Sequence, residues 1–113
     1  MKVSSVDLKR TIVLISGHGT NLQAIIDEIN ENQLPIDITA VISDNPQAYG
    51  LERAKKFGIP THVIDRHSTL NLGNFHHAME KLVKKLDPDL ILLAGYMSIL
   101  SKKFCHQFNG KIL

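Results

Sequence analysis

The residues whose types and spacing most clearly indicate a binding site directly follow an apolar run at residues 11–15. They are Ser16-Gly17-His18-Gly19-Thr20-Asn21. Two glycines after a buried strand turn the chain sharply and let backbone N–H groups approach an anion with no Cβ in between. The pattern predicts that an amphipathic helix starts at once. The first N–H groups of a helix have no intrahelical partner and lie at the positive end of its dipole. We therefore expect residues 17–21 to form a phosphate-binding loop.

This loop matches neither of the two common nucleotide-binding patterns. The dinucleotide pattern needs a third glycine where Leu22 stands, and the P-loop needs a lysine that does not follow Gly19. Thr20 and Gln23 also fit a capping box, which would explain both residues as helix starters. The sequence leaves the phosphate loop and the simple helix start as alternatives.

Three further polar residues lie near predicted strand ends, and two of them have two interpretations each. His18 is either a solvent-facing loop residue or a cationic phosphate contact. Asp44 either belongs to a turn at residues 43–46, which the turn preferences favour, or binds a ribose. Ser16 lacks the flanking glycines of a nucleophile elbow and is interpreted as a strand-end residue. The six histidines and the single Cys105 show no zinc-ligand spacing, so no metal is expected.

Composition excludes several classes of function. The chain has 113 residues, 43% of them hydrophobic and 21% charged, which indicates one folded domain. A net charge of +2 and six aromatic residues give no basic, stacking surface for nucleic acid. Residues 1–10 are polar and unlike a signal peptide, and no apolar run is long enough to span a membrane. The absence of both predicts a cytoplasmic protein, and the single cysteine, which allows no intrachain disulfide, fits a reducing compartment.

The elements that would position the loop alternate between strand and helix. Strands are predicted at residues 11–15, 36–43, 61–64 and 90–94, and a fifth starts at 111–113. Helices are predicted at 21–30, at 45–57 with Asn45 as N-cap, at about 75–86 and at 101–108. This alternation predicts an α/β fold, a Rossmann-like and mostly parallel sheet with helices on both faces. The strand at 90–94 is apolar on both faces and is expected to be central.

Ligands of such sheets bind beyond the carboxyl ends of the strands, where the strand order reverses. The loops at residues 17–21 and 95–100 are the two candidates for that crevice. The second loop, Gly95-Tyr96-Met97-Ser98-Ile99-Leu100, is unusually apolar. Either it packs under the sheet edge or it forms the wall of an apolar ligand pocket.

Four stretches of the chain closely resemble the N-terminus of the phosphoribosylglycinamide formyltransferase family, the folate-dependent enzymes of purine synthesis. They are residues 13–26 (VLISGHGTNLQAII), 41–54 (with VISDN and AYGLERA), 58–62 (GIPTH) and 88–97 (PDLILLAGYM). The similarity spans about residues 11–113, and the loop pattern Ser-Gly-x-Gly-Thr/Ser-Asn-Leu-Gln is fairly specific. It predicts the formyltransferase fold.

The resemblance implies transfer of a formyl group from 10-formyltetrahydrofolate to the amine of glycinamide ribonucleotide, without a metal. By that resemblance Gly19, Thr20 and Asn21 hold the substrate phosphate. The folate-pocket segment is similarly placed at Met97, Ser98, Ile99 and Leu100. The family usually has arginine where this chain has Ser98, and another expected just before the helix at 75–86.

The resemblance also divides the chain and implies what lies outside it. Residues 1–10 are expected to be a polar N-terminal extension and residues 11–113 the N-terminal part of a formyltransferase domain. The family's catalytic asparagine and histidine directly follow Gly-Lys-Ile-Leu and an aspartate comes later, so no catalytic residue is expected within this chain. The 113 residues alone are expected to be inactive and to self-associate through the truncated sheet. A formyltetrahydrofolate hydrolase and a non-catalytic binding module for a phosphorylated ligand are the alternatives.

Overall fold

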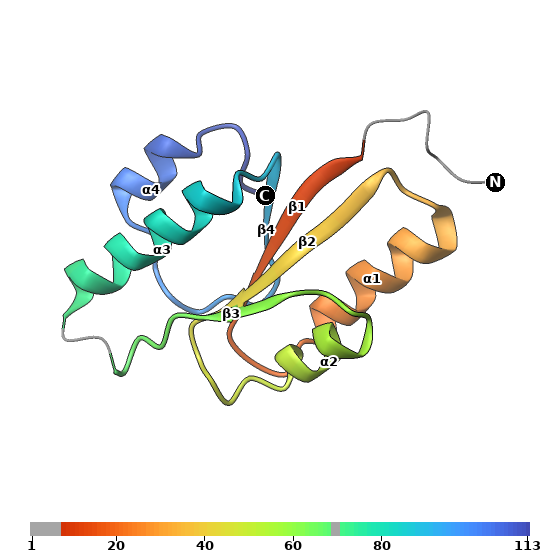
Figure 1. Cartoon of the computed structure of the whole chain (residues 1–113), viewed down its shortest axis with the longest axis horizontal. Coiled ribbons are helices and arrows are strands. Elements are labelled where there is room, and N and C mark those ends of the chain that lie inside the picture. Colours follow the sequence, from red (N-terminus) through yellow and green to blue (C-terminus); the bar gives the residue numbers. More distant parts are fainter. Residues whose placement is uncertain (1–7, 69–70) are drawn as a thin grey trace.

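The computed structural model describes residues 8–68 and 71–113, and shows strands alternating with helices along the chain (Figure 1). The elements are β1 (Lys9–Ile15), α1 (Thr20–Asn32), β2 (Ile36–Ser43), α2 (Gly50–Lys56), β3 (Thr61–Val63), α3 (Leu72–Leu86), β4 (Leu90–Leu93) and α4 (Lys102–Gln107). The predicted α/β alternation is confirmed.

The four strands form one sheet in the order β3-β2-β1-β4, and every pair is parallel. From β1 the chain passes through α1 to β2 on one side, and it later returns through α3 to β4 on the other side. The strand order therefore reverses at β1, and the crevice of the fold is expected beyond the carboxyl ends of β1 and β4.

Helices cover both faces of the sheet, as predicted (Figure 1). Successive residues of β1 point to opposite faces, so its apolar side chains contribute to a core on each face. Ile12 and Leu14 belong to a core that includes Phe75 of α3 and Phe104 of α4. Alternate β1 residues face a second core built with α1 and α2; its buried members are Val13, Ile15, Leu22, Ile26, Val41, Ala48, Leu51, Ala54 and Ala94. Two cores on one buried strand hold the strand ends, and hence the loops, in place.

The start of a fifth strand is also confirmed. Ile112 forms a parallel bridge with Ile91 of β4. The Ile91 N–H donates to the Lys111 carbonyl and the Leu113 N–H to the Ile91 carbonyl, both at 2.8 Å. β4 therefore lies between β1 and residues 111–113, which agrees with its apolar sequence. The most deeply buried strand is nevertheless β1, whose residues 11–15 are all 0% exposed while Lys9 and Arg10 are exposed.

Three predicted starts differ from the structure by two or more residues, and one of them is that of α3, which begins at Leu72 and not near residue 75. β1 begins at Lys9, so the polar segment expected at residues 1–10 overlaps the strand; residues 1–7 lie outside the described part of the chain. Helix α2 begins at Gly50 and not after Asn45. The Asn45 side chain instead accepts from the Gln47 N–H at 3.0 Å, which closes a turn. Asn45 resembles a helix cap in sequence because the same hydrogen bond serves both purposes.

Candidate functional site

The two loops predicted to border the crevice are in contact. Ser16, the last residue before the glycine turn, accepts a hydrogen bond from the Met97 N–H to its Oγ at 2.7 Å. A Cβ placed on Gly95 would lie 3.7 Å from Asn21 Nδ2. The loop after β1 and the loop after β4 therefore form one continuous rim at the carboxyl edge of the sheet.

The N-terminus of α1 has the features of an anion site. Gly19 is the N-cap in the left-handed conformation (φ 83°), and no side chain caps the helix. The first intrahelical bond runs from the Gln23 N–H to the Gly19 carbonyl, so the Thr20 and Asn21 N–H groups have no helix carbonyl to bond. Thr20 and Asn21 are exposed, and the first turn of α1 carries no acidic residue. These backbone donors and the helix dipole favour an anion.

The capping-box interpretation of Thr20 and Gln23 is wrong. Thr20 is the first helical residue and does not act as the cap. The Gln23 side chain donates to Asp27 at 3.0 Å and accepts from Arg53 at 3.4 Å. The Thr20 hydroxyl does not cap the helix, as the helix-start alternative required, and is thus available to a ligand.

Gly19 is needed for a reason that the sequence did not show. A Cβ on Gly19 would lie 2.5 Å from the Gly50 Cα, and a Cβ on Gly50 would lie 3.1 Å from the Gly19 Cα. The Gly50 N–H also donates to the Gly17 carbonyl at 3.1 Å. The glycine turn at residues 17–19 therefore packs directly on the start of α2. The positive φ of Gly19 is a second reason why this position requires glycine.

Arg53 of α2 secures the loop from the other side. Its Nε donates to the His18 carbonyl at 2.8 Å, and its Nη2 lies 3.0 Å from His18 Nδ1. The guanidinium carbon lies 5.1 Å from the centre of the Tyr49 ring, within range of a cation–π contact. His18 is exposed, as its solvent-facing interpretation predicts, and its ring lies 5.1 Å from that of Tyr49. We did not single out Arg53 from the sequence, because its partner His18 is 35 residues away.

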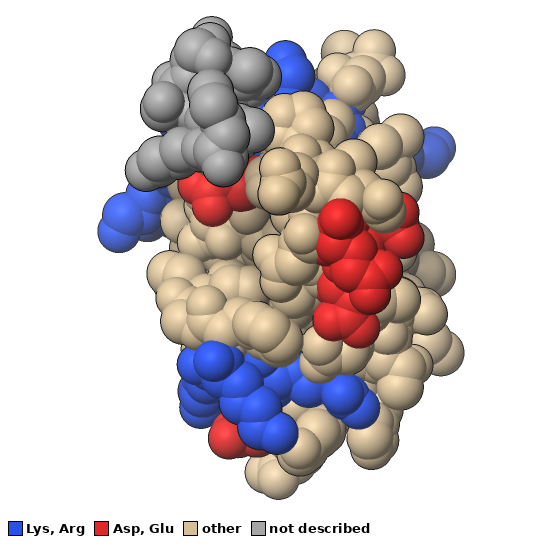
Figure 2. Space-filling model, turned by 90° about the vertical axis from the view of Figure 1, so that its right-hand side faces the viewer, with Lys and Arg blue, Asp and Glu red and all other residues tan. Residues whose placement is uncertain are grey.

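Charge on the side of the molecule that carries α1 is arranged in separate patches (Figure 2). The space-filling view shows acidic side chains near the top and in the middle and, below them, a group of basic ones. The exposed acidic residues of α1 lie in its middle and last turns, at Asp27, Glu28 and Glu31, away from the candidate anion site. The adjacent helix α2 ends in basic residues, at Arg53, Lys55 and Lys56. This distribution leaves the N-terminus of α1 free of negative charge.

Part of the second loop packs against the core, as one of its two predicted alternatives holds. Tyr96 and Leu100 are half-buried and pack against the core formed with α3 and α4. Met97 and Ile99 point away from it and are 72% and 82% exposed. Two large apolar side chains at the crevice rim are thus accessible to a ligand, and their role as a pocket wall stays a prediction.

Asp44 does not form the turn that its sequence context favours. That turn is built by its neighbours, since Ser43 Oγ donates to the Asn45 carbonyl at 2.8 Å and accepts from the Asn45 N–H at 3.0 Å. The Asp44 side chain is completely buried, accepts from the Ser98 hydroxyl and pairs with Arg66 at 3.5 Å. The guanidinium beside position 98 therefore belongs to Arg66, from the loop after β3.

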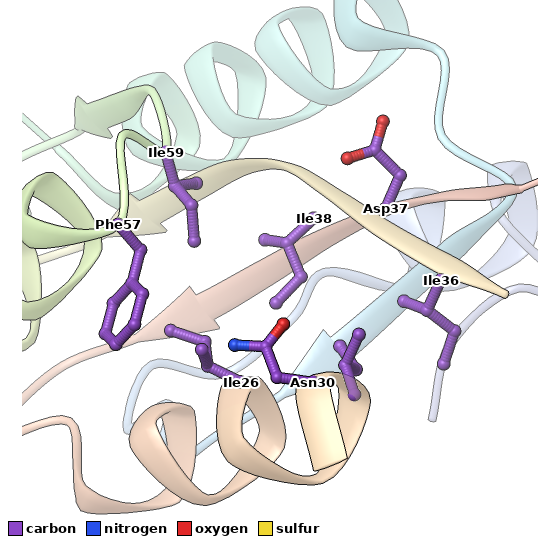
Figure 3. Close-up of a pocket in the computed structure, with 8 residues that line it drawn as sticks. Ile26, Asn30, Ile36, Asp37, Ile38, Phe57 and Ile59 are labelled. Carbon is purple, nitrogen blue, oxygen red and sulfur yellow. The ribbon is translucent and has the colours of Figure 1, made fainter. Parts of the chain in front are cut away.

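A pocket at the other end of the strands, opposite the two loops, is separate from this site (Figure 3). It lies between α1, the start of β2 and the segment before β3, and is lined by Ile26, Ile29, Asn30, Ile36, Asp37, Ile38, Phe57 and Ile59. Ile36 is the first residue of β2, so the pocket lies at the amino ends of the strands. Ligands of parallel sheets bind at the other end, which favours the two loops as the site.

Among residues 8–68 and 71–113, no group of three or more His, Cys, Asp or Glu side chains could hold a metal ion. In the same part of the chain, no helix is both long and apolar enough to cross a membrane.

Comparisons with known proteins agree with this geometry. Residues 9–113 match the sequence pattern of the formyl transferase family. The chain is 47% identical to phosphoribosylglycinamide formyltransferase of Haemophilus influenzae over 94% of its own length and 50% of that protein. It is 41% identical to the human trifunctional purine biosynthetic protein adenosine-3 over 92% of its own length and 10% of that protein. The chain thus spans about half the length of the single-function relative.

Solved structures show the same relationship. The phosphoribosylglycinamide formyltransferase of Coxiella burnetii superposes with a TM-score of 0.87 at 44% identity, covering 93% of this chain and 49% of that one. A formyltetrahydrofolate deformylase from Pseudomonas putida, at 22% identity and a TM-score of 0.79, shares the fold. With a family match over residues 9–113 and the loops described above, this chain belongs to the formyl transferase family.

Proposed function

We propose that the protein transfers a formyl group from 10-formyltetrahydrofolate to the amine of glycinamide ribonucleotide, in the cytoplasm. In this proposal the chain supplies the phosphate-binding half of the site. The observation that carries it is the uncapped N-terminus of α1, where the N–H groups of Thr20 and Asn21 have no helix carbonyl to bond, beside the contact of Gly19 with Gly50. The names of the relatives supply the reaction and the substrate class.

The roles of individual residues follow from their place on the rim. Gly19, Thr20 and Asn21 hold the phosphate through two backbone donors and two polar side chains. The folate lies against Met97, Ser98, Ile99 and Leu100, where the exposed Met97 and Ile99 offer apolar contact. We assign no acid, base or metal ligand within the chain. The proposed catalytic groups belong to other parts of the protein.

A charge placed at the proposed phosphate site tests this assignment. Asn21→Asp keeps the size of the side chain and puts a carboxylate beside the bound phosphate. We expect the full-length protein to bind glycinamide ribonucleotide roughly 100-fold more weakly, since like charges at about 5 Å repel by about 3 kcal/mol near a protein surface. Isothermal calorimetry measures this affinity directly.

Asn30→Asp is the matched control, because it makes the same change on the same helix, about nine residues or 14 Å away. This variant should bind the nucleotide like the parent protein. Equal affinity of Asn21→Asp and the parent would contradict a phosphate site at this helix end. Folate binding without nucleotide binding in the parent protein would favour the formyltetrahydrofolate hydrolase, and phosphate binding without folate binding would favour a non-catalytic module.

Self-association is a separate part of the proposal. The outer edge of residues 111–113 offers unpaired backbone groups to a second copy, since their inner edge is already bonded to β4. Sedimentation of the 113-residue chain over a range of concentrations tests this. A monomer at every concentration would remove self-association from the proposal.

A further inference from the structure

A buried carboxylate at the carboxyl end of β2 has no role in the site as described so far. Asp44 directly follows β2, and its side chain is 0% exposed. Carboxylates are almost never completely buried unless other groups pair with them. The groups that contact Asp44 therefore indicate what its burial achieves.

Those groups come from two other loops. Ser98, in the loop after β4, donates its hydroxyl to Asp44 Oδ2. Arg66, in the loop after β3, places Nη1 3.5 Å from the same oxygen and 3.4 Å from Ser98 Oγ. The Arg66 backbone N–H also donates to the Asp44 carbonyl at 3.2 Å. We call these three residues the Asp44 cluster; it joins the loops after β2, β3 and β4 at one carboxylate.

The cluster also has hydrogen-bonding capacity that the described residues do not use. Asp44 Oδ1 is buried and has no hydrogen-bond partner among residues 8–68 and 71–113. Burial, and next the negative charge of Asp44, raise the pKa of Tyr96 beside the cluster. A buried acceptor left unpaired in this way requires an explanation beyond simple stability.

We propose that Asp44 is a positioning residue for the folate side of the crevice, which it serves by holding Ser98 and Arg66 in place. Ser98 lies between Met97 and Ile99, so a fixed Ser98 sets where those two exposed side chains present their apolar surface. The inference rests on the proposed function, because it takes residues 97–100 as the folate-contacting segment. Preorganising such a loop lowers the entropy lost when a ligand binds.

The charge of Asp44, and not only its size, is essential to this role. An asparagine oxygen in the place of Oδ2 can still accept from the Ser98 hydroxyl, but it carries no charge to pair with the Arg66 guanidinium, which contacts the same oxygen. Asp44→Asn should therefore weaken the hold on Arg66 while it leaves the shape of the cluster almost unchanged. A second change, Arg66→Gln, removes the guanidinium charge that has lost its partner and keeps an NH₂ donor for the asparagine oxygen.

The experiment measures two affinities separately in the full-length protein, with 5-formyltetrahydrofolate and glycinamide ribonucleotide as probes. We expect Asp44→Asn to raise the folate dissociation constant roughly three- to tenfold, since one loop must be ordered on binding. The nucleotide dissociation constant should stay within about twofold, because the phosphate loop is held by Gly50 and Arg53 and not by this cluster. The double variant Asp44→Asn/Arg66→Gln should recover part of the folate affinity.

Asp37→Asn is the matched control, since Asp37 is an exposed aspartate near the start of β2, and Asp44 follows the end of that strand. It should change neither affinity. Backbone amide NMR shifts provide a readout that needs no ligand: in Asp44→Asn they should move at residues 97–99 and not at 17–21. If Asp44→Asn fails to fold, Arg66→Gln alone should move the same amides.

The outcomes separate this inference from the proposed function. An unchanged folate affinity with unmoved amides at residues 97–99 would overturn the role of Asp44. Equal losses of folate and nucleotide affinity would also overturn it, because they indicate a general structural defect. A parent protein that binds neither probe, but whose amides at 97–99 move in Asp44→Asn, would refute the proposed function and keep the loop-positioning effect.

Discussion

The two loops at the crevice lie side by side but are held in different ways. The loop after β1 is fixed mainly through its backbone, by the contact of Gly19 with Gly50 and by the bond from Arg53 to the His18 carbonyl. The loop after β4 is fixed by side chains, through the Ser16 hydroxyl that accepts from the Met97 N–H and the Ser98 hydroxyl that donates to Asp44.

This difference fits the two kinds of ligand that we propose for the loops. An anion can be bound by backbone N–H groups, so side chains such as His18 need not contact it for the site to work. A flat, largely apolar molecule needs apolar side chains at defined positions, and these depend on the bonds that fix their loop. We therefore expect backbone changes to damage the first loop and polar side-chain changes to damage the second.

The largest effect is expected from Gly19→Ala. Its Cβ would lie 2.5 Å from the Gly50 Cα at a residue with φ 83°, so both a backbone clash and a strained conformation result. Overpacking and left-handed strain together should lower the free energy of unfolding by about 2–4 kcal/mol. Chemical denaturation measures this change.

Gly17→Ala is the control for that prediction, because a Cβ on Gly17 meets no atom within 4 Å. It should cost well under about 1 kcal/mol. If both alanine variants were equally stable, the first loop would not depend on its contact with α2.

A smaller effect is expected from Arg53→Gln, which removes the bonds that α2 makes to the first loop. The side chain is partly exposed, so its loss should lower the free energy of unfolding by only about 1–2 kcal/mol. Nucleotide affinity should fall while folate affinity is kept, since Arg53 contacts His18 and Gln23 and not residues 95–100. Lys55→Gln, on the same helix, is the control, and an equal effect from both would show that only net charge matters.

The smallest effect on stability is expected from Ile99→Asp. The side chain is 82% exposed, so the free energy of unfolding should change by no more than about 0.5 kcal/mol. The folate dissociation constant should nevertheless rise, because a charge enters a surface that the ligand desolvates. Calorimetry with both probes checks this, and a parallel loss of nucleotide affinity would show that the two loops are not independent.

Local sequence patterns were sufficient for most of the fold. The alternation of apolar strands with amphipathic helices predicted the parallel sheet and the helices on both faces. The turn at residues 17–19 located the helix end with free N–H groups, because strand, turn and helix are adjacent in the chain. The fifth strand was also predictable from three residues, since Ile112 continues the same pattern.

The errors arose where one sequence pattern serves two local structures. Asn45 before a proline is typical of a helix cap, yet it closes a turn, and α2 starts five residues later. Thr20 and Gln23 have capping-box spacing, yet Gly19 is the cap and Gln23 bonds Asp27 and Arg53. In each case the same kind of local hydrogen bond forms readily in both local structures, so the packing of the whole helix decides which of the two is adopted.

The sequence by itself determined that a glycine turn would present backbone donors at the end of a buried strand, because that depends only on neighbouring residues. Only the tertiary structure decided what holds this turn and the loop beside it. Gly19 meets Gly50, Arg53 meets His18, and Asp44 meets both Arg66 and Ser98. These partners are 22 to 54 residues apart in the chain, and parallel strands with crossover helices bring them to one edge of the sheet. The identity of such contacts depends on how the elements pack, which local periodicity does not encode.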